Sequence, residues 1–319
     1  MPDPSISVAL CTYNGARFLR EQLVSIASQT LQPMEIVVCD DGSTDGTIGV
    51  IKDFAATAGM NVRIYQNERN LGSTKNFEKV VSLCAGEFIA LSDQDDQWKP
   101  NKLEVLTGAL CRSGAGAAFS DAELMDGDSH QIPGTLWIEN RFRGLRSELN
   151  HSRSGAVSEL LKRNVVTGAT VVFRESLRKI LLPFPTEWVH DGWLAWMCVL
   201  YSSLIAIPEC LMRYRVHGRQ QEGVPGSVLD RFRRARTRGM EDSLRVVEQF
   251  RVLLRFLEND DRDDDLMIRS LIEGKIRNTQ FRAQLDTKRL PRLFQILLES
   301  PAYLRFTQGW LSMAKDAIL

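Results

Sequence analysis

Apolar runs alternate with amphipathic segments along the first hundred residues of the chain. Four runs have the length and composition of buried strands, at 6–11, 35–39, 62–66 and 87–92. Between them lie three segments that we expect to be helical, at 16–29, 45–58 and 74–84. In the first of these, one stripe holds the apolar side chains Phe18, Leu19, Leu23, Ile26 and Ala27. This alternation predicts an α/β fold with a doubly wound, mostly parallel sheet flanked by helices.

The pattern changes after residue 116, where isolated apolar runs replace the regular alternation. We expect strands at 117–121, 165–173, 203–208 and 211–216, a polar loop over 126–155, and a helix after Asp191. Beyond Gly226 the chain becomes helical and rich in charge, with five arginines in 231–238 and an acidic cluster in 259–265. These changes predict a domain at 1–225, in two halves at 1–116 and 117–225, and a helical extension at 226–319.

Each predicted strand of the first half ends in a polar turn, and the carboxyl ends of parallel strands meet at the edge where ligands bind. The turn at 93–96 holds Asp93, Asp95 and Asp96, whose oxygens suit Mg²⁺ or Mn²⁺ with water and phosphate oxygens completing the shell. The alternative is an acidic turn before a helix that starts near Pro100, with Asp96 as its N-cap. Further polar turns at 12–15, 40–43 and 67–73 favour a shared site.

Several classes of protein are excluded by what the sequence lacks. No GxGxxG opens the first helix and no GxxxxGK[ST] occurs, which argues against a dinucleotide-binding Rossmann enzyme and a P-loop NTPase. Forty basic residues balance forty acidic ones, whereas a nucleic-acid-binding protein usually has a basic excess. Any phosphate in the site must therefore be met by metal and side chains, and we expect no nucleic-acid partner.

Cysteine usage and the N-terminus bear on the compartment. The six cysteines are spaced irregularly, with no CxxC, at Cys11, Cys39, Cys84, Cys111, Cys198 and Cys210. They indicate reduced, packed thiols. The N-terminus has no basic n-region, and the longest uncharged stretch, 192–208, is shorter than the roughly 18 to 20 residues of a membrane span. We expect a cytoplasmic protein.

Seven segments, taken together and in this order, resemble glycosyltransferase family 2 with a GT-A fold. They are SVALCTYNGARFLREQLVSIASQT, EIVVCDDGSTDGT, NLGSTKNFEKV, GEFIALSDQDDQWKPNKLE, VTGATVVFRESL, HDGWLA and YRVHG. Within the family the chain is most similar to bacterial rhamnosyltransferase-like members, and the resemblance covers about residues 5–220. It implies that 1–116 holds the nucleotide-sugar and 117–225 the acceptor.

The resemblance assigns roles on the donor side. Thr12, Tyr13 and Asn14 match the family's contact to base and ribose, and Asp40 matches the carboxylate that accepts a hydrogen bond from the pyrimidine N–H. Asp93 and Asp95 match the DxD pair, with Asp95 the direct ligand of Mg²⁺ or Mn²⁺ and Asp93 facing ribose or donor sugar. Asp41, Lys75 and Asn76 fall near the donor, and His217 matches a histidine that approaches the metal or diphosphate.

On the acceptor side, Asp191 in HDGW matches the family's general base, and Trp188, Trp193 and Gly168 are candidate acceptor contacts. The chemistry agrees, because an inverting displacement needs one base for the acceptor hydroxyl and one electrophile for the departing diphosphate. No second carboxylate is needed as nucleophile. Trp188, Trp193 and Trp196 around that base would raise its pKa by desolvation and could stack on sugar rings.

Structural explanations compete with each of these roles. Asp191 precedes an apolar helix and would serve equally as its N-cap, His217 as a structural donor, and Asp41 as the residue that orders its turn. Tyr13 could simply pack on the sheet edge. The tryptophans fit a protein core as well as a sugar platform.

The sequence predicts a metal-dependent inverting glycosyltransferase that acts on a hydroxyl of a cell-surface polysaccharide or lipid-linked glycan. The favoured donor is dTDP-rhamnose, by subfamily likeness, and the alternative is UDP-hexose or UDP-N-acetylhexosamine. Outside this class stand a non-catalytic glycan- or nucleotide-binding protein and a nucleotidylyltransferase, but CTYNGARF lacks the basic, glycine-rich segment of the latter.

The helical extension has two interpretations. Arginines beside LPRLFQILL and YLRFTQGWL would bind an anionic membrane at the inner face of the plasma membrane, at roughly 1 kcal/mol per basic residue. A solvated hairpin packed on the catalytic domain or a second subunit fits the same pattern.

Overall fold

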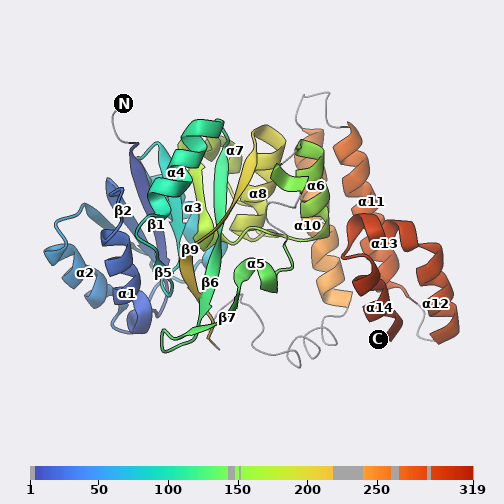
Figure 1. Cartoon of the computed structure of the whole chain (residues 1–319), viewed down its shortest axis with the longest axis horizontal. Helices are drawn as coiled ribbons and strands as arrows, with labels where there is room; N and C mark the ends of the chain where they lie inside the picture. The colour runs from blue at the N-terminus through green and yellow to red at the C-terminus, as the bar shows by residue number, and fades with distance from the viewer. Residues whose placement is uncertain are drawn as a thin grey trace. The chain divides into compact units, whose positions relative to one another are not determined.

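The computed structural model describes residues 4–142, 148–150, 152–217, 240–259, 266–285 and 289–318. The chain forms two compact units (Figure 1). The first, which we call the N-terminal unit, comprises Met1–Ala156 and Val165–Val224. The C-terminal unit comprises Pro225–Leu319 and takes in the short segment Val157–Asn164. The arginines of 231–238 lie outside the described residues, as does the acidic cluster beyond Asn259.

The first four strands of the N-terminal unit are parallel and lie in the order β3-β2-β1-β4. They are β1 (Ile6–Thr12), β2 (Glu35–Asp40), β3 (Val62–Gln66) and β4 (Phe88–Ser92). The connecting helices are α1 (Ala16–Ala27), α2 (Thr47–Thr57) and α3 (Ser73–Leu83). The predicted alternation is confirmed, because each element carries its own apolar period.

Beyond β4 the sheet continues as β8-β6-β9-β5, with β7 beside β6. These strands are β5 (Gln97–Trp98), β6 (Ala117–Met125), β7 (Gln131–Thr135), β8 (Val171–Arg174) and β9 (Leu204–Arg215). β8 is antiparallel to β4 and β6, whereas β9 is parallel to β6. The sheet is therefore mixed, and β3, β2, β1 and β4 form its continuous parallel part.

Helices cover both faces of this sheet. Apolar side chains of α1, α2 and α4 (Lys102–Ser113) join Ile6, Val8 and Leu10 of β1 in one buried core. On the other face, α3 packs on β1 and β2 and contacts α8 (His190–Tyr201), a helix that is buried almost throughout. The short α7 (Arg178–Leu181) packs against α8.

The prediction of a loop over 126–155 is wrong for much of that range. Besides β7 it holds α5 (Leu136–Glu139), a 3₁₀ turn at Glu148–Asn150 and the start of α6 (Arg153–Lys162). Trp137 is 6% exposed and meets Phe142 edge-on, with ring centroids 4.8 Å apart. The carboxylate of Asp121 accepts a hydrogen bond from the Trp137 backbone N–H at 2.9 Å. Aromatic packing therefore orders a segment whose composition is mostly polar.

Three predicted strands also differ from the observed ones. The runs at 203–208 and 211–216 form a single strand, β9, whose pairing with β6 shifts register next to Ser120 and Asp121. Pro208 lies at this irregularity, where its missing N–H costs no ladder bond. In the run 165–173, residues Gly168–Thr170 form a 3₁₀ turn, and β8 begins only at Val171.

The C-terminal unit is helical, as predicted. Its helices are α10 (Met240–Glu258), α11 (Leu266–Ala283), α12 (Arg289–Leu298), α13 (Ser300–Phe306) and α14 (Trp310–Ile318). A small core gathers Ile296, Tyr303 and Met313. The buried Asp316 accepts hydrogen bonds from Arg282 Nε at 2.6 Å and from the Tyr303 hydroxyl at 2.7 Å, which ties α11, α13 and α14 together.

None of the helices that the structure describes is both long and apolar enough to cross a membrane. All six cysteines are free thiols, of which Cys11, Cys39, Cys84 and Cys198 are buried and Cys111, on α4, is exposed.

Candidate active site

The predicted site residues gather where β1, β2 and β4 end, as expected for an open α/β sheet. The turn after β4 carries Asp93 and Asp95, and the chain leaving β9 carries His217. Nε2 of His217 lies 2.8 Å from Oδ2 of Asp95, and both side chains are partly exposed, at 17% and 15%. Two residues 122 positions apart are thus in direct contact.

Asp93 shows that further carboxylates are close. Desolvation, followed by the charges of Asp95 and Asp191, raises the pKa of Asp93 to about 7. Asp93, Asp95 and Asp191 therefore share one negatively charged region that reaches from β4 to α8.

A divalent cation fits the chemistry of the Asp95–His217 pair, since a carboxylate oxygen and an imidazole nitrogen lie 2.8 Å apart at a partly open surface. Within the described ranges, no group of three or more His, Cys, Asp or Glu side chains is arranged to hold a metal ion.

The loop after β1 is held from two sides. Gln94 accepts a hydrogen bond from the Tyr13 backbone N–H at 2.8 Å and donates to the Tyr13 carbonyl at 3.0 Å. Asn14 has a left-handed backbone with φ of 49°, which asparagine tolerates well, and its side chain accepts from the Thr44 N–H at 2.9 Å. The rings and amides of Tyr13 and Asn14 remain exposed to a ligand, with Tyr13 at 43%.

Thr12 and Asp40 lie beneath that loop and are buried. The Thr12 hydroxyl donates to Oδ2 of Asp40 at 2.8 Å, and the Ser43 N–H donates to Oδ1 at 2.9 Å. Oδ2 also accepts from the Ser43 hydroxyl, so the lone pair that remains for the predicted role of Asp40 as an acceptor is on Oδ1.

Asp41 and Asn76, two further residues predicted to bind the donor, point into the protein. Asp41 accepts from the N–H groups of Leu71 and Gly72, at 2.8 and 2.9 Å. Asn76 donates to the Cys39 carbonyl at 2.8 Å and is 2% exposed. Asp41 therefore shapes the 67–72 turn and not, as the structural alternative had it, its own DDGS turn. Asn76 supports the same turn by accepting from Nδ2 of Asn67 at 2.9 Å.

Lys75 lies on the surface of α3, where its ammonium bonds to Glu78 at 2.7 Å and to the Phe184 carbonyl at 2.8 Å. The structure therefore places its charge away from free solvent and onto the segment that leads to α8.

Asp191 lies in the first turn of α8, and the N-cap position of that helix is Val189. The alternative of an N-cap role for Asp191 is therefore wrong. Its Oδ2 accepts a hydrogen bond from the Gly168 N–H at 3.2 Å. Gly168 has no room for a side chain, because a Cβ there would lie 2.6 Å from Nε2 of His190.

The three tryptophans belong to the core rather than to an open sugar platform. Trp193 and Trp196 are each 2% exposed, and Trp188 is 7% exposed. The Trp193 indole N–H donates to the Leu181 carbonyl at 3.1 Å. Their rings therefore support the helix that carries Asp191.

Residues that the sequence analysis missed hold this site in place. Arg215 is fully buried, and its guanidinium donates to the Asp95 carbonyl at 2.6 Å, Ser129 at 2.8 Å and Glu21 at 2.7 Å. The sequence did contain a sign of this role, since Arg215 stands at the end of an apolar run and only two residues before His217.

A second missed residue is Lys102, which is buried, bonds to the Ala169 carbonyl at 2.5 Å and lies 3.6 Å from the centre of the Trp98 ring. Burial holds the pKa of Lys102 well below its usual range and raises that of Asp96 well above. Asp96 accepts from the Arg215 N–H at 3.0 Å, so it is a support beneath the site and not the N-cap of α4, which is Asn101.

Comparison with known proteins now adds to this geometry. Residues 7–181 match the family model of glycosyl transferase family 2. The chain belongs to this family. An uncharacterized glycosyltransferase of Nostoc is 25% identical over 313 residues, which cover 93% of the chain and 89% of that protein. A UDP-Glc:α-D-GlcNAc-diphosphoundecaprenol β-1,3-glucosyltransferase of Escherichia coli is 25% identical over 66% of the chain and 75% of its own length.

Solved structures support the same fold. Staphylococcus aureus TarS, in complex with UDP-GlcNAc, aligns with a TM-score of 0.59 at 18% identity, over 93% of the chain and 81% of that structure. A mannosyltransferase of Pyrobaculum calidifontis, in complex with GDP-Man and Mn²⁺, aligns with a TM-score of 0.57 at 17% identity, over 99% and 86%. The predicted family and GT-A fold are confirmed. The protein is a glycosyltransferase, and its reaction moves a sugar from a nucleotide sugar.

Proposed function

We propose that this glycosyltransferase is a metal-dependent, inverting enzyme whose acceptor is a hydroxyl of a cell-surface polysaccharide or lipid-linked glycan. The observation that carries the proposal is the contact between Asp95 and His217, next to Asp93 and Asp191. It offers two metal-binding atoms and a nearby carboxylate within one region, which is the minimum that a direct displacement needs.

Asp191 is the proposed base. Its carboxylate takes the proton of the acceptor hydroxyl while that oxygen attacks the anomeric carbon and the bond to the diphosphate oxygen breaks. The Gly168 N–H bonds to Oδ2 of Asp191 and orients the carboxylate. Asp95 and His217 would hold a divalent ion which, when bound, offsets the negative charge of the leaving nucleoside diphosphate.

Tyr13 and Asn14 are the proposed contacts for the base and ribose, with Asp40 below them to accept from the pyrimidine N–H, and Asp93 is proposed to face the ribose or donor sugar. dTDP-rhamnose is the first donor candidate. UDP-linked hexoses are the alternative, and UDP-Glc, the donor in the name of the Escherichia coli relative, favours them. Thymine and uracil differ by one methyl group, worth about 1 kcal/mol of apolar contact.

Isothermal titration with dTDP, UDP and GDP, each with Mn²⁺, with Mg²⁺ and with EDTA, tests this proposal. We expect one pyrimidine diphosphate to bind only with metal, and Asp95→Ala to lose that binding. Asp53→Ala, at an exposed position of α2, is the matched control and should bind like the natural protein. Equal binding with EDTA and with metal would refute the metal-dependent site.

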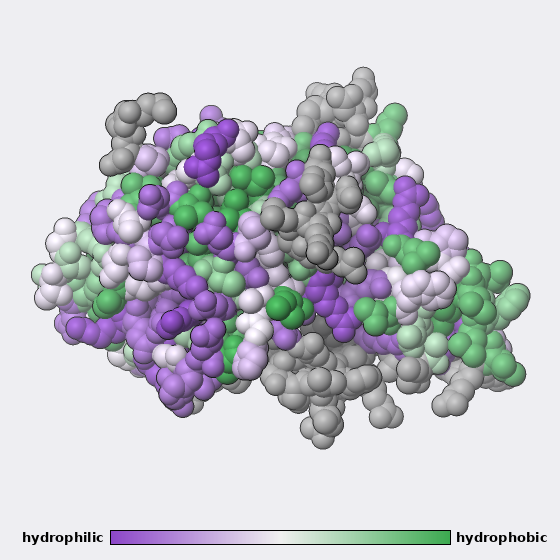
Figure 2. All heavy atoms as spheres, viewed as in Figure 1, coloured by the Kyte–Doolittle hydropathy of each residue, from purple (hydrophilic) through white to green (hydrophobic). Residues whose placement is uncertain are grey.

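We also propose that the C-terminal unit binds an anionic lipid surface, where a lipid-linked acceptor would be found. Figure 2 shows apolar side chains gathered over α12. Eight large apolar side chains of α12–α14 are between 42% and 81% exposed: Leu290, Leu293, Phe294, Leu297, Leu298, Leu304, Trp310 and Leu311. Residues 289–318 hold four basic residues and two acidic ones, and one of the acids, Asp316, is buried against Arg282. Exposed Leu, Phe and Trp beside basic residues suit the boundary of an anionic bilayer.

Co-sedimentation with phosphatidylglycerol vesicles, compared with phosphatidylcholine vesicles, tests this surface. Phe294→Glu with Leu297→Glu should release the protein from the anionic vesicles. Val24→Glu with Ile138→Glu, which changes apolar residues of similar exposure in the N-terminal unit, should not. A dimer in solution that the first pair of changes dissociates, without any vesicle binding, would assign the surface to a second copy of the chain instead.

A further inference from the structure

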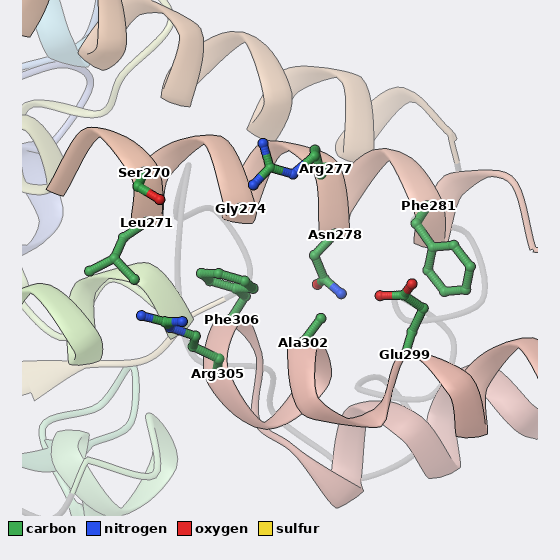
Figure 3. A pocket seen from close by; sticks show the side chains of 10 residues that line it. All are labelled: Ser270, Leu271, Gly274, Arg277, Asn278, Phe281, Glu299, Ala302, Arg305 and Phe306. Atoms are coloured by element: carbon green, nitrogen blue, oxygen red, sulfur yellow. The ribbon is translucent and has the colours of Figure 1, made fainter. Parts of the chain in front are cut away.

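A pocket inside the C-terminal unit lies between α11 and α13 and has a volume of about 400 Å³, within the size range of small-molecule sites. Its walls come from two helices that approach closely, because a Cβ at Gly274 would lie 2.4 Å from Cζ of Phe306. Figure 3 shows Asn278 extending from α11 into this space and Glu299 facing it from the start of α13. No residue of the proposed donor site takes part.

Asn278 is the feature that points to a ligand. The side chain is 3% exposed, yet neither its Oδ1 nor its Nδ2 has a hydrogen-bond partner. A buried amide is almost always bonded on both sides, so an unpaired one calls for a group that this unit does not itself provide. The amide offers one acceptor and two N–H donors toward the cavity.

The surroundings restrict the chemistry of that group. Glu299 adds an acceptor, and Arg277 and Arg305, which also line the pocket, add N–H donors. The site can therefore bond to groups that both donate and accept, as hydroxyl groups do. Phe281 and Phe306 supply apolar walls on either side of the two polar groups (Figure 3). A sugar ring combines adjacent hydroxyls, each both donor and acceptor, with an apolar C–H face.

We propose that this pocket is a carbohydrate-binding site, separate from the donor site, in which Asn278 and Glu299 bind neighbouring hydroxyls of one sugar ring. Nδ2 of Asn278 donates to one hydroxyl and Oδ1 accepts from it or its neighbour, while the Glu299 carboxylate accepts from the second. The inference goes beyond the proposed function, and it does not require that the transferase reaction be as proposed.

Saturation-transfer NMR of the full chain with methyl α-L-rhamnoside, methyl β-D-glucoside and N-acetylglucosamine tests this site, with inorganic phosphate as an anionic probe. We expect at least one sugar to bind, and Asn278→Leu to weaken it roughly tenfold through the loss of two hydrogen bonds. Asp95→Ala should leave the signal unchanged, so that failure of the donor site and failure of this pocket are distinguished.

Ala302→Leu adds volume in the pocket without changing the amide, and it should also abolish sugar binding. If the Asn278 variant does not fold, this second variant tests whether the sugar binds in the pocket. Sugar binding that persists in both variants would overturn the proposal, as would the absence of binding by any of the sugars. Tighter binding of phosphate than of sugar would overturn the chemical class, and water alone would then be the partner of Asn278.

Discussion

Gly15 is the residue at which the loop after β1 meets Gln94, and it has no space for a side chain. A Cβ there would lie 2.0 Å from Oε1 of Gln94. Gly15→Ala should therefore displace Gln94 and break its two hydrogen bonds to Tyr13, each worth about 1 kcal/mol. We expect nucleotide binding about tenfold weaker by titration. Gly49→Ala, in α2 with open space around it, should leave binding unchanged and stabilise the protein by about 0.5–1 kcal/mol.

Asp191→Asn tests the proposed base with little change of shape, because the amide oxygen can still accept from the Gly168 N–H. We expect the transfer rate to fall by about 10²–10⁴-fold, the usual contribution of a general base, and nucleotide affinity to stay within twofold. Initial rates and titration on the same sample measure the two effects. A parallel loss of nucleotide affinity would mean that Asp191 binds the donor instead.

Residue chemistry could be predicted from the sequence only in part. Asp93, Asp95, Asp191 and His217 stand out because each follows or precedes an apolar run, and the structure brings them together. The inward orientation of Asp41 and Asn76 could not be predicted, because their partners are backbone groups of Leu71, Gly72 and Cys39, and backbone groups have no letter in the sequence.

At the scale of elements, Arg215 joins the end of β9 to the turn after β4, to α1 and to the turn before β7. Arg215→Met would remove bonds to Asp95, Ser129 and Glu21. The Asp95 carbonyl would lose a charged donor, whereas the carboxylate of Glu21, 46% exposed, would stay in contact with water, so we expect a cost of about 2–3 kcal/mol in the free energy of unfolding. Arg213→Met, two residues away on the same strand, removes only a 46% exposed ion pair with Glu123 and should cost less than about 1 kcal/mol. Urea denaturation of both variants measures the difference. Equal costs would show that Arg215 is not the anchor.

The elements themselves were predictable where their signal is local. The strands and helices from β1 to β4 follow from period and length alone, and they were predicted to within a few residues. The two-residue strand β5 was missed. β7 and α5 were missed because Pro133 and Gly134 interrupt any alternation, and because the aromatic contacts that order the segment, such as Trp137 with Phe119 at 5.7 Å, join distant positions. β9 was divided in two because a proline inside a strand normally ends it.

At the scale of the whole molecule, the chain forms two compact units, and the buried Lys275 belongs to the C-terminal one. We therefore expect Lys275 to make the stability of that unit depend on pH. Desolvation, with a smaller effect of the Arg282 charge, lowers the pKa of the buried Lys275 to about 7. Between pH 7 and the ordinary lysine pKa, the unfolded chain binds more protons than the folded one, so the free energy of unfolding rises with pH. Below pH 7 Lys275 is charged in both states, and the free-energy cost of burying that charge is complete. We expect a gain of about 2 kcal/mol between pH 7 and 9 in the transition of the C-terminal unit.

Calorimetry of the natural protein and of Lys275→Met at several pH values measures this gain as a difference. The variant should lack it, and the transition of the N-terminal unit should be the same in both proteins. Parallel pH profiles for the natural and variant C-terminal units would contradict the assignment to Lys275.

The distribution of the cysteines has a practical consequence for labelling the protein in solution. Burial raises the pKa of Cys39 to about 11 and that of Cys84 to about 12, and it raises the pKa of Cys11 and Cys198 as well. Cys210 is partly buried and has a pKa of about 11. Because the thiolate is the reactive form, a maleimide dye at neutral pH should attach to Cys111. The natural chain thus carries one ready position for a fluorescent reporter on α4, with no need to engineer the other cysteines away.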